Sequence, residues 1–234
     1  MADRPLQGVL QGVLQGVLQG VLLDVDGTLI DSNDAHAESW ADTLTEAGYA
    51  VGASRVRPLI GMGGDKLLPK LTGLKNESEP AKELAARRSE IFHDRYLPTL
   101  QPLPGARALL ERMHSARLTM VVATSAQREE LEEMLKQVGL LDLLPQKTSS
   151  DDAEESKPDP DILQAALKRG RLDAARTVMI GDTPYDVEAA QRAGVRCIGF
   201  RSGGWDDAGL AGAIAIYDGP ADLLAQWKGS PFAN

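Results

Sequence analysis

The sequence contains few of the residues that build disulfide frameworks and zinc sites. Its 234 residues include a single cysteine, Cys197, and three histidines, His36, His93 and His114, which lie far apart along the chain. One cysteine cannot form an intramolecular disulfide or a cysteine-based zinc cluster, and it fits a reducing cytoplasmic compartment. We therefore expect a cytoplasmic protein with neither a disulfide framework nor a zinc site.

Long apolar segments and an excess of basic residues are also missing. No apolar run reaches the roughly 18 residues that a membrane-spanning helix needs. The chain carries 34 acidic and 25 basic side chains, which gives a net charge of −9. Nucleic acids and anionic membranes are bound by basic surfaces, so we expect neither as a partner. A small anionic substrate requires a metal ion or a lysine that offsets the negative charge locally.

A tandem repeat occupies the N-terminus, where Gln-Gly-Val-Leu occurs four times over residues 7–22. Only the last copy, residues 19–22, directly precedes Leu23 and Asp24, so only this copy is expected to form a core strand. Glutamine interrupts the apolar stretch and no cleavage site follows it, which argues against a signal peptide. We interpret residues 1–18 as an arm that arose by internal expansion and has no catalytic role.

The most informative stretch follows this repeat. The apolar run from Val21 to Leu23 ends on Asp24, and Asp26 and Gly27 come shortly after it. In open α/β sheets the reactive groups lie just beyond the carboxyl ends of strands, and strand alternation points Asp24 and Asp26 the same way. Two carboxylates this close repel each other unless a cation or a shared proton relieves the repulsion. The pattern predicts a functional site rather than a solvated turn.

Further along, the sequence first predicts helices and then an alternation of helices and strands. Helical patterns cover 35–47, 65–71 and 79–96. After residue 102, expected strands at 118–123, 145–149, 177–180, 195–200 and 213–217 alternate with expected helices at 106–116, 128–138, 160–169, 185–193 and 221–227. This order is typical of a doubly wound parallel α/β sheet. We expect a core of residues 19–33 and 102–234 and an inserted helical cap of residues 34–101.

Two later segments carry groups that suit phosphate chemistry. Thr124 and Ser125 follow an apolar strand, and hydroxyl and backbone N–H groups at the start of a helix can hold phosphate oxygens. The same pair also suits an ordinary helix N-cap. Lys157 directly precedes Pro158, and Pro160 follows two residues later; these prolines stiffen the loop. A lysine aimed at a group of carboxylates would offset both their repulsion and the charge of a phosphoryl group.

A second strand end repeats the pattern of glycine and carboxylate. Asp182 follows Gly181, and Asp186 comes four residues later. Magnesium prefers oxygen ligands, usually one or two carboxylates with waters and a substrate phosphate. We expect Asp24 and Asp182 to supply those carboxylates and the Asp26 carbonyl to be a third ligand. Asp186 is expected to hold the metal's waters, and its place in the first turn of a helix also suits the helix dipole.

Taken in order, these groups resemble the motifs of the haloacid dehalogenase-like hydrolases over residues 19 to about 227. The resemblance implies a Rossmann-like core, a helical cap, and Mg²⁺ as the cofactor. It also implies that Asp24 is the nucleophile that forms an aspartyl-phosphate, and that Asp26 is the general acid and base. The resemblance implies that the catalytic residues are Asp24, Asp26, Thr124 and Lys157. It implies that the metal-binding residues are Asp24, Asp26, Asp182 and Asp186.

Asp26 distinguishes between branches of this family. Dehalogenases and phosphonoacetaldehyde hydrolases of the fold lack this second aspartate, so neither activity is expected. The spacing of His36 and Trp40 from Asp26 is similar to that in beta-phosphoglucomutases. The arginine by which the mutase cap grips a second phosphate is, however, replaced here by Gly64.

We therefore expect a hydrolase of small phosphate monoesters similar to phosphoglycolate phosphatase, with the mutase as the alternative. A catalytically inactive binding protein of the same fold is a further alternative, but no motif acid is missing. The expected partner is a small phosphorylated metabolite, bound by a monomer or homodimer. His36 is expected either to position Asp26 or to pair with Asp34 at a hinge. The residues expected to bind substrate are Thr28, Ser125, His36 and Lys66.

Overall fold

The structure is a computed structural model, and it describes residues 18–233. The predictions for the N-terminal arm therefore lie, except for Leu18, outside the described residues. Leu18 itself is buried, with 8% of its surface exposed, and it belongs to the main hydrophobic core.

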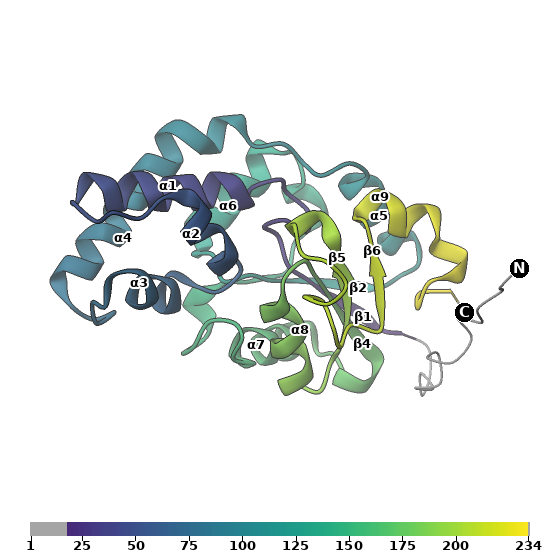
Figure 1. Ribbon diagram of the computed structural model, residues 1–234. Coiled ribbons are helices and arrows are strands. Elements are labelled where there is room, and N and C mark those ends of the chain that lie inside the picture. Colours follow the sequence, from purple (N-terminus) through teal and green to yellow (C-terminus); the bar gives the residue numbers. More distant parts are fainter. Residues whose placement is uncertain (1–17, 234) are drawn as a thin grey trace, which may run out of the picture.

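Within residues 18–233, a six-stranded, all-parallel sheet forms the centre of the fold (Figure 1). The strand order is β3-β2-β1-β4-β5-β6, which confirms the predicted doubly wound α/β class. The first strand therefore lies between β2 and β4 in the middle of the sheet. The strands are β1 (Gly20–Leu23), β2 (Thr119–Ala123), β3 (Lys147–Thr148), β4 (Thr177–Gly181), β5 (Arg196–Phe200) and β6 (Ala215–Tyr217).

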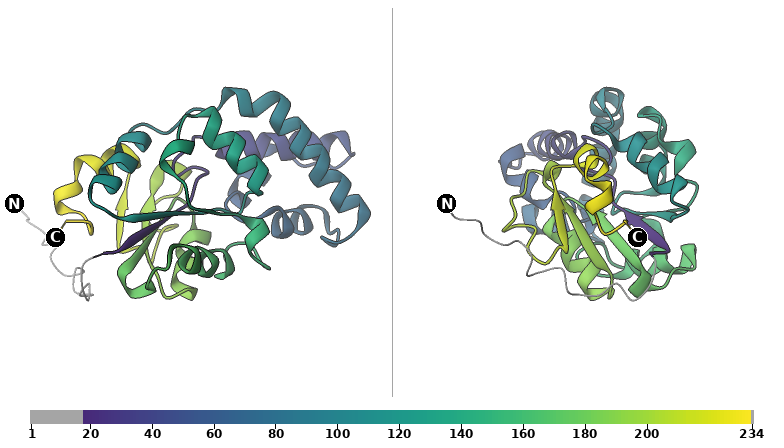
Figure 2. Two further views of the ribbon diagram at one scale, coloured as in Figure 1. Left: turned by 180° about the vertical axis from the view of Figure 1, so that it is seen from behind. Right: turned by 90° about the vertical axis from the view of Figure 1, so that its right-hand side faces the viewer.

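Helices cover both faces of this sheet, as Figure 2 shows from behind and from the side. On β1, Val21 and Leu23 pack into the hydrophobic cluster of one face, and Leu22 packs into the cluster of the other. This alternation buries the strand completely. The first face carries α5 (Ala106–Ser115), α6 (Arg128–Gln137) and α9 (Pro220–Ala225), and the second carries α7 (Asp161–Gly170) and α8 (Pro184–Arg192).

A helical segment, residues 33–99, lies between β1 and β2 in the sequence. Its helices share a third hydrophobic cluster, which is separate from the two clusters of the sheet. The predicted single helix 79–96 is α4 followed by a π-helical turn, Phe92–Tyr96. The helices of the segment are α1 (Asn33–Glu46), α2 (Ala53–Val56), α3 (Gly64–Thr72) and α4 (Glu79–Ile91).

The helical segment lies at the end of the molecule toward which β1 points, and the C-terminus lies at the opposite end (Figure 1). The carboxyl ends of the central strands therefore face the segment. None of the helices in residues 18–233 combines the length and the apolar character needed to cross a membrane.

Candidate active site

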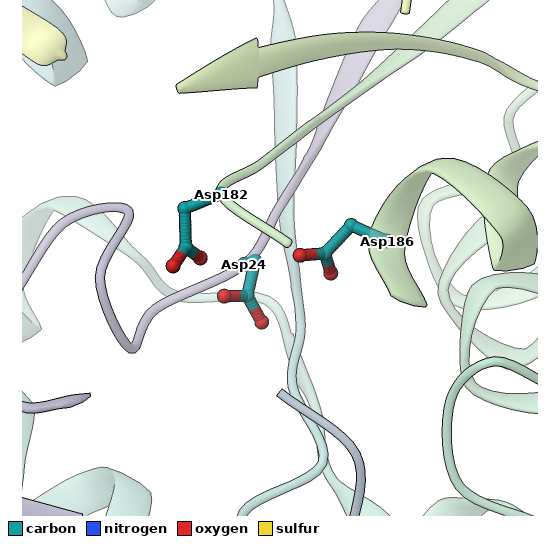
Figure 3. A group of neighbouring side chains, drawn as sticks. All are labelled: Asp24, Asp182 and Asp186. Carbon is teal, nitrogen blue, oxygen red and sulfur yellow. The ribbon is translucent and has the colours of Figure 1, made fainter. Parts of the chain in front are cut away.

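Three carboxylates converge at the carboxyl ends of the two central strands (Figure 3). Asp24 directly follows β1, Asp182 directly follows β4, and Asp186 lies in the first turn of α8. One oxygen of each lies within 4.8 Å of the others, and all three side chains are buried. The structure thus brings together three of the acidic residues that were predicted from the sequence to lie at the metal site.

The local sequence explains how these side chains are positioned. Strand pairing aligns Leu23 with Ile180, so β1 and β4 end at the same level and the Asp24 N–H donates to the Ile180 carbonyl at 3.0 Å. Thr183 and Asp186 form a capping box: the Thr183 N–H donates to Asp186 Oδ2 at 3.0 Å, and the Asp186 N–H donates to Thr183 Oγ1 at 3.3 Å. This cap fixes the direction of the Asp186 carboxylate.

Lys157 lies between two of the carboxylates, where the sequence predicted a compensating cation. Its Nζ donates to Asp24 Oδ1 at 2.5 Å and to Asp186 Oδ1 at 2.7 Å. The side chain is only 1% exposed. Burial alone would lower the pKa of Lys157, but the attraction of Asp186 and Asp24 raises it above its ordinary value. Lys157 therefore holds Asp24 through a charged hydrogen bond.

Two neutral side chains hold Asp182. Asn33 donates to its Oδ2 at 2.8 Å, and the Thr28 hydroxyl donates to its Oδ1 at 2.9 Å. Gly27 makes this packing possible: its φ is +72°, and a Cβ there would lie 2.1 Å from both Asn33 Nδ2 and Asp182 Oδ2. Thr28 also lies 3.3 Å from Asp24 Oδ2. Its hydroxyl therefore orients carboxylates and is not among the groups that line the pocket described below.

The cluster holds more negative charge than Lys157 neutralises. Burial raises the pKa of Asp24 well above its usual range despite Lys157, and the neighbouring carboxylates add to the rise. Burial and Asp186 likewise raise the pKa of Asp182 to about 7, although Asn33 and Thr28 stabilise its charged form. A further cation would remove this repulsion.

The donor set suits Mg²⁺, since the side chains that converge here offer carboxylate oxygens. Asp24 and Asp182 each have oxygens bound by single neutral or charged donors, which leaves lone pairs for a cation. Asn33 Oδ1 is buried beside Asp182 without a hydrogen-bond partner among the described residues, and a water of a hydrated cation would satisfy it. Asp186 already binds Lys157 and Thr183 through its two oxygens.

Asp26 lies two residues after Asp24, in the loop that follows β1. Its Oδ1 accepts hydrogen bonds from Ser32 Oγ at 2.5 Å and contacts His36 Nε2 at 2.7 Å. Burial alone would raise the pKa of Asp26, but His36 and Ser32 at the carboxylate and the nearby charge of Arg88 lower it to about 2. Asp26 is therefore ionised in this arrangement.

His36 connects Asp26 to the helical segment. Its ring stacks on Phe92 with a centroid distance of 4.4 Å, and its Nδ1 contacts the Arg88 guanidinium. The sequence left open whether His36 positions Asp26 or pairs with Asp34. The second alternative is wrong in this structure, because Asp34 instead binds Arg57 at 2.6 Å.

A pocket of about 330 Å³ opens over Asp24 and Asp26, between the helical segment and the core. Thr124 lies on its wall, and Ser125 there donates to the Gly61 carbonyl at 3.4 Å. The glycine-rich loop of residues 61–64 forms another part of the wall. The lining residues from the helical segment also include Trp40, Asn76, Arg88 and Ser89.

Lys66 has a different environment from the one expected. It is not among the residues that line the pocket. Its Nζ binds the Asp159 carboxylate and lies 3.3 Å from Glu155 Oε2, both on the loop that carries Lys157. Lys66 thus links the helical segment to the core, and a contact with substrate stays a prediction.

Sequence reasoning missed several residues of the site. Arg88 and Glu130 lie on helices that read only as charged and amphipathic, and their side chains meet across the pocket at 2.5 Å. Asn33 stands at the start of a helix, where it resembles an ordinary capping residue. None of these belongs to a local motif, so only the packing of distant segments could identify them.

Comparisons with known proteins agree with this geometry. The family model "Haloacid dehalogenase-like hydrolase" matches residues 21–200. A phosphoglycolate phosphatase from Vibrio vulnificus is 30% identical over 211 residues, which cover 87% of this chain and 91% of that protein. A crystal structure of a hydrolase from Pseudomonas syringae superimposes with a TM-score of 0.83 at 30% identity, covering 91% of this chain and 98% of that one.

A structure assigned to the beta-phosphoglucomutases, from Bacteroides vulgatus, is also similar. Its TM-score is 0.80 at 25% identity, and the match covers 91% of this chain and 88% of that one. The parallel α/β sheet with carboxylates at its strand ends is the architecture of a phosphoryl-transfer class of Rossmann-like proteins. The chain belongs to the haloacid dehalogenase-like hydrolases.

Proposed function

We propose that the protein is an Mg²⁺-dependent phosphatase that hydrolyses a small-molecule phosphate monoester through an aspartyl-phosphate on Asp24. The observation that carries this proposal is the position of Asp24, which borders the pocket while Lys157 and two further buried carboxylates surround it. The enzyme is thus a phosphoric monoester hydrolase. The names of its relatives make phosphoglycolate the first compound to test.

In the first step the Asp24 carboxylate attacks phosphorus, and the bond between phosphorus and the alcohol oxygen breaks. Lys157 holds the attacking carboxylate in place and offsets charge as the phosphoryl group approaches. Thr124, on the pocket wall, is suited to bind a phosphoryl oxygen through its hydroxyl. Asp26 gives a proton to the departing alcohol oxygen. Approach of the anionic phosphate favours the protonated form of Asp26 that this step requires.

In the second step Asp26 removes a proton from water, and the water oxygen attacks the phosphorus of the aspartyl-phosphate. The Asp24–phosphate bond breaks, which regenerates the Asp24 carboxylate and releases inorganic phosphate. The carboxylate form of Asp26, stabilised by Ser32 and His36, is the form that accepts this proton.

The carboxylates of Asp24 and Asp182 and the carbonyl of Asp26 would hold the Mg²⁺, with Asp186 in support. When bound, the ion supplies positive charge that neutralises and orients the phosphoryl oxygens. We further propose that residues 34–101 act as a cap whose closure excludes water and completes the pocket. The boundaries of this cap remain those that the sequence predicts.

A phosphosugar mutase is the second candidate. The contact of His36 with Asp26 and the similarity to a structure assigned to the beta-phosphoglucomutases favour it. A mutase has to retain a bisphosphate, and Gly64 offers no side chain for a second phosphate. Conversion of beta-glucose 1-phosphate to glucose 6-phosphate that depends on a bisphosphate would establish the mutase in place of the phosphatase.

Phosphate release from a panel of phosphate monoesters, measured with Mg²⁺ and with EDTA, tests the proposed activity. We expect turnover only with the metal ion. Asp24→Asn should lower kcat by about 10⁴-fold or more, since loss of a nucleophile removes the covalent route. Asp31→Asn is the matched control, because Asp31 is an exposed carboxylate on the same connection. Full activity of Asp24→Asn would contradict the assignment of the nucleophile.

A further inference from the structure

In the part of the pocket beyond the catalytic carboxylates, acidic side chains outnumber basic ones. The acidic side chains that line it are Asp65, Glu130 and Glu154. Among the described residues, Arg88 is the only lysine or arginine in this lining. The charge of Arg88 would be the natural partner for a second anionic group on a substrate. Whether Arg88 can bind such a group depends on which protein groups its guanidinium already contacts.

Every nitrogen of the Arg88 guanidinium has a partner within the protein. Nε donates to Ser39 Oγ at 3.2 Å, Nη1 donates to Glu130 Oε2 at 2.5 Å, and Nη2 contacts His36 Nδ1. The Arg88 Cζ atom lies 4.6 Å from the centre of the Phe92 ring, and this ring covers part of one face of the guanidinium group. The Arg88 side chain is only 11% exposed.

Glu130 therefore neutralises the charge of Arg88. The Glu130 side chain is 12% exposed, so this ion pair is largely shielded from water and is stronger than a surface pair. An anionic group that sought Arg88 would have to displace Glu130, and it would leave that carboxylate without its partner. The carboxylates of Asp65 and Glu154 would repel it as well. Hydroxyl groups, by contrast, can donate hydrogen bonds to the same carboxylates.

We infer that Glu130 determines specificity by excluding phosphate monoesters that carry a second anionic group in addition to the phosphate. The substrates are then phosphate esters of uncharged alcohols with further hydroxyl groups. This inference rests on the proposed phosphatase function. It predicts that phosphoglycolate, which carries a carboxylate, is a poorer substrate than an uncharged ester of the same size.

Two pairs of substrates with nearly equal size test this. The first pair is 2-hydroxyethyl phosphate and phosphoglycolate, and the second is glycerol 3-phosphate and 3-phosphoglycerate. Within each pair a hydroxymethyl group replaces a carboxylate. For the wild type we expect kcat/KM to favour the uncharged member by about tenfold or more in both pairs. This measurement needs no variant, so it stays decisive if a substitution impairs folding.

Glu130→Gln keeps the shape of the side chain and removes its charge, which frees Arg88 for an anionic group. We expect the preference for the uncharged member to fall by about tenfold, mainly through a gain on the charged member. Glu130→Ala should act in the same direction. Glu132→Gln is the matched control, because Glu132 lies on the same helix but does not line the pocket, and the preference should be unchanged.

A wild type that prefers the charged members, or a preference that Glu130→Gln and Glu130→Ala leave intact, would overturn the inference. p-Nitrophenyl phosphate separates this failure from failure of the proposed function. If the wild type hydrolyses neither this compound nor either pair with Mg²⁺, the phosphatase assignment itself is wrong. If it hydrolyses p-nitrophenyl phosphate with the opposite charge preference, only the role of Glu130 is wrong.

Discussion

Lys157, which is buried, and Arg88, which is largely buried, differ in the charge that surrounds them. Lys157 binds Asp24 and Asp186, with Asp182 beside them, so one positive charge faces three carboxylates. Arg88 binds the single carboxylate of Glu130. The first group keeps an excess of negative charge that a divalent cation can neutralise. The second group is already balanced, and it offers little to an anionic ligand.

In the proposed function, the group around Lys157 serves catalysis, and the pair of Arg88 and Glu130 serves substrate recognition in the same pocket. In the proposed function a metal ion binds at the strand ends and offsets the mutual repulsion of the carboxylates there. Across the pocket, the pair of Arg88 and Glu130 joins the helical segment to α6 of the core. Changes to the two cations should therefore have different consequences.

The largest effect is expected for Lys157→Met. Removal of the cation leaves buried carboxylates without compensation, so we expect the free energy of unfolding to fall by about 3 kcal/mol. kcat should fall by about 10²-fold or more, because Asp24 loses the hydrogen bond from Lys157. Chemical denaturation and steady-state kinetics measure both quantities.

Mg²⁺ sharpens this test. If the excess charge is the cause, added Mg²⁺ should stabilise Lys157→Met more than it stabilises the wild type. Lys168→Met, at an exposed position of α7, should change the stability by less than about 0.5 kcal/mol. Equal stability of wild type and Lys157→Met would show that Lys157 does not compensate the carboxylates.

Arg88→Met should have an intermediate effect. It leaves Glu130 unpaired and removes the contact with His36, and we expect the free energy of unfolding to fall by about 1–3 kcal/mol. kcat should fall by about tenfold, since His36 is less well held against Asp26. Combining Arg88→Met with Glu130→Gln should cost less than the sum of the single changes, because the two groups interact.

Arg87→Met is the matched control for this experiment. Arg87 precedes Arg88 on α4 and binds Glu46 and Glu90 at the exposed surface. Exposed ion pairs contribute little, so stability and kcat should change far less. Similar losses for the two arginines would contradict the distinction between a buried and an exposed pair.

The smallest effect is expected for deletion of residues 7–18. The last copy of the repeat keeps its register with Asp24, and Leu6 then directly precedes Gln19, as Leu18 does in the full chain. We expect kcat/KM within about twofold of the wild type. A large loss of activity in a folded deletion variant would show that the arm reaches the site, and a melting temperature lower by several degrees would show that it supports the fold.

The sequence predicted the catalytic end of the pocket better than the recognition end. Asp24, Asp182 and Asp186 follow buried strands or begin a helix, so local patterns locate them, and the parallel sheet then brings them together. Arg88, Glu130 and Asn33 carry no such pattern, because their roles arise from contacts between distant helices and loops. Lys66 shows the same limit: its pairing with Asp159 depends on where the loop of Lys157 lies.

The covalent intermediate on Asp24 is the most direct test of the account. Asp26→Ala removes the base that hydrolyses the intermediate, so the phosphorylated enzyme should accumulate when this variant meets p-nitrophenyl phosphate and Mg²⁺, since that leaving group needs little protonation. Acid quenching and peptide mass spectrometry should then find one added phosphoryl group on Asp24, and none in the double variant with Asp24→Asn. A phosphoryl group on another residue, or release of phosphate by Asp24→Asn at the wild-type rate, would contradict the central claim.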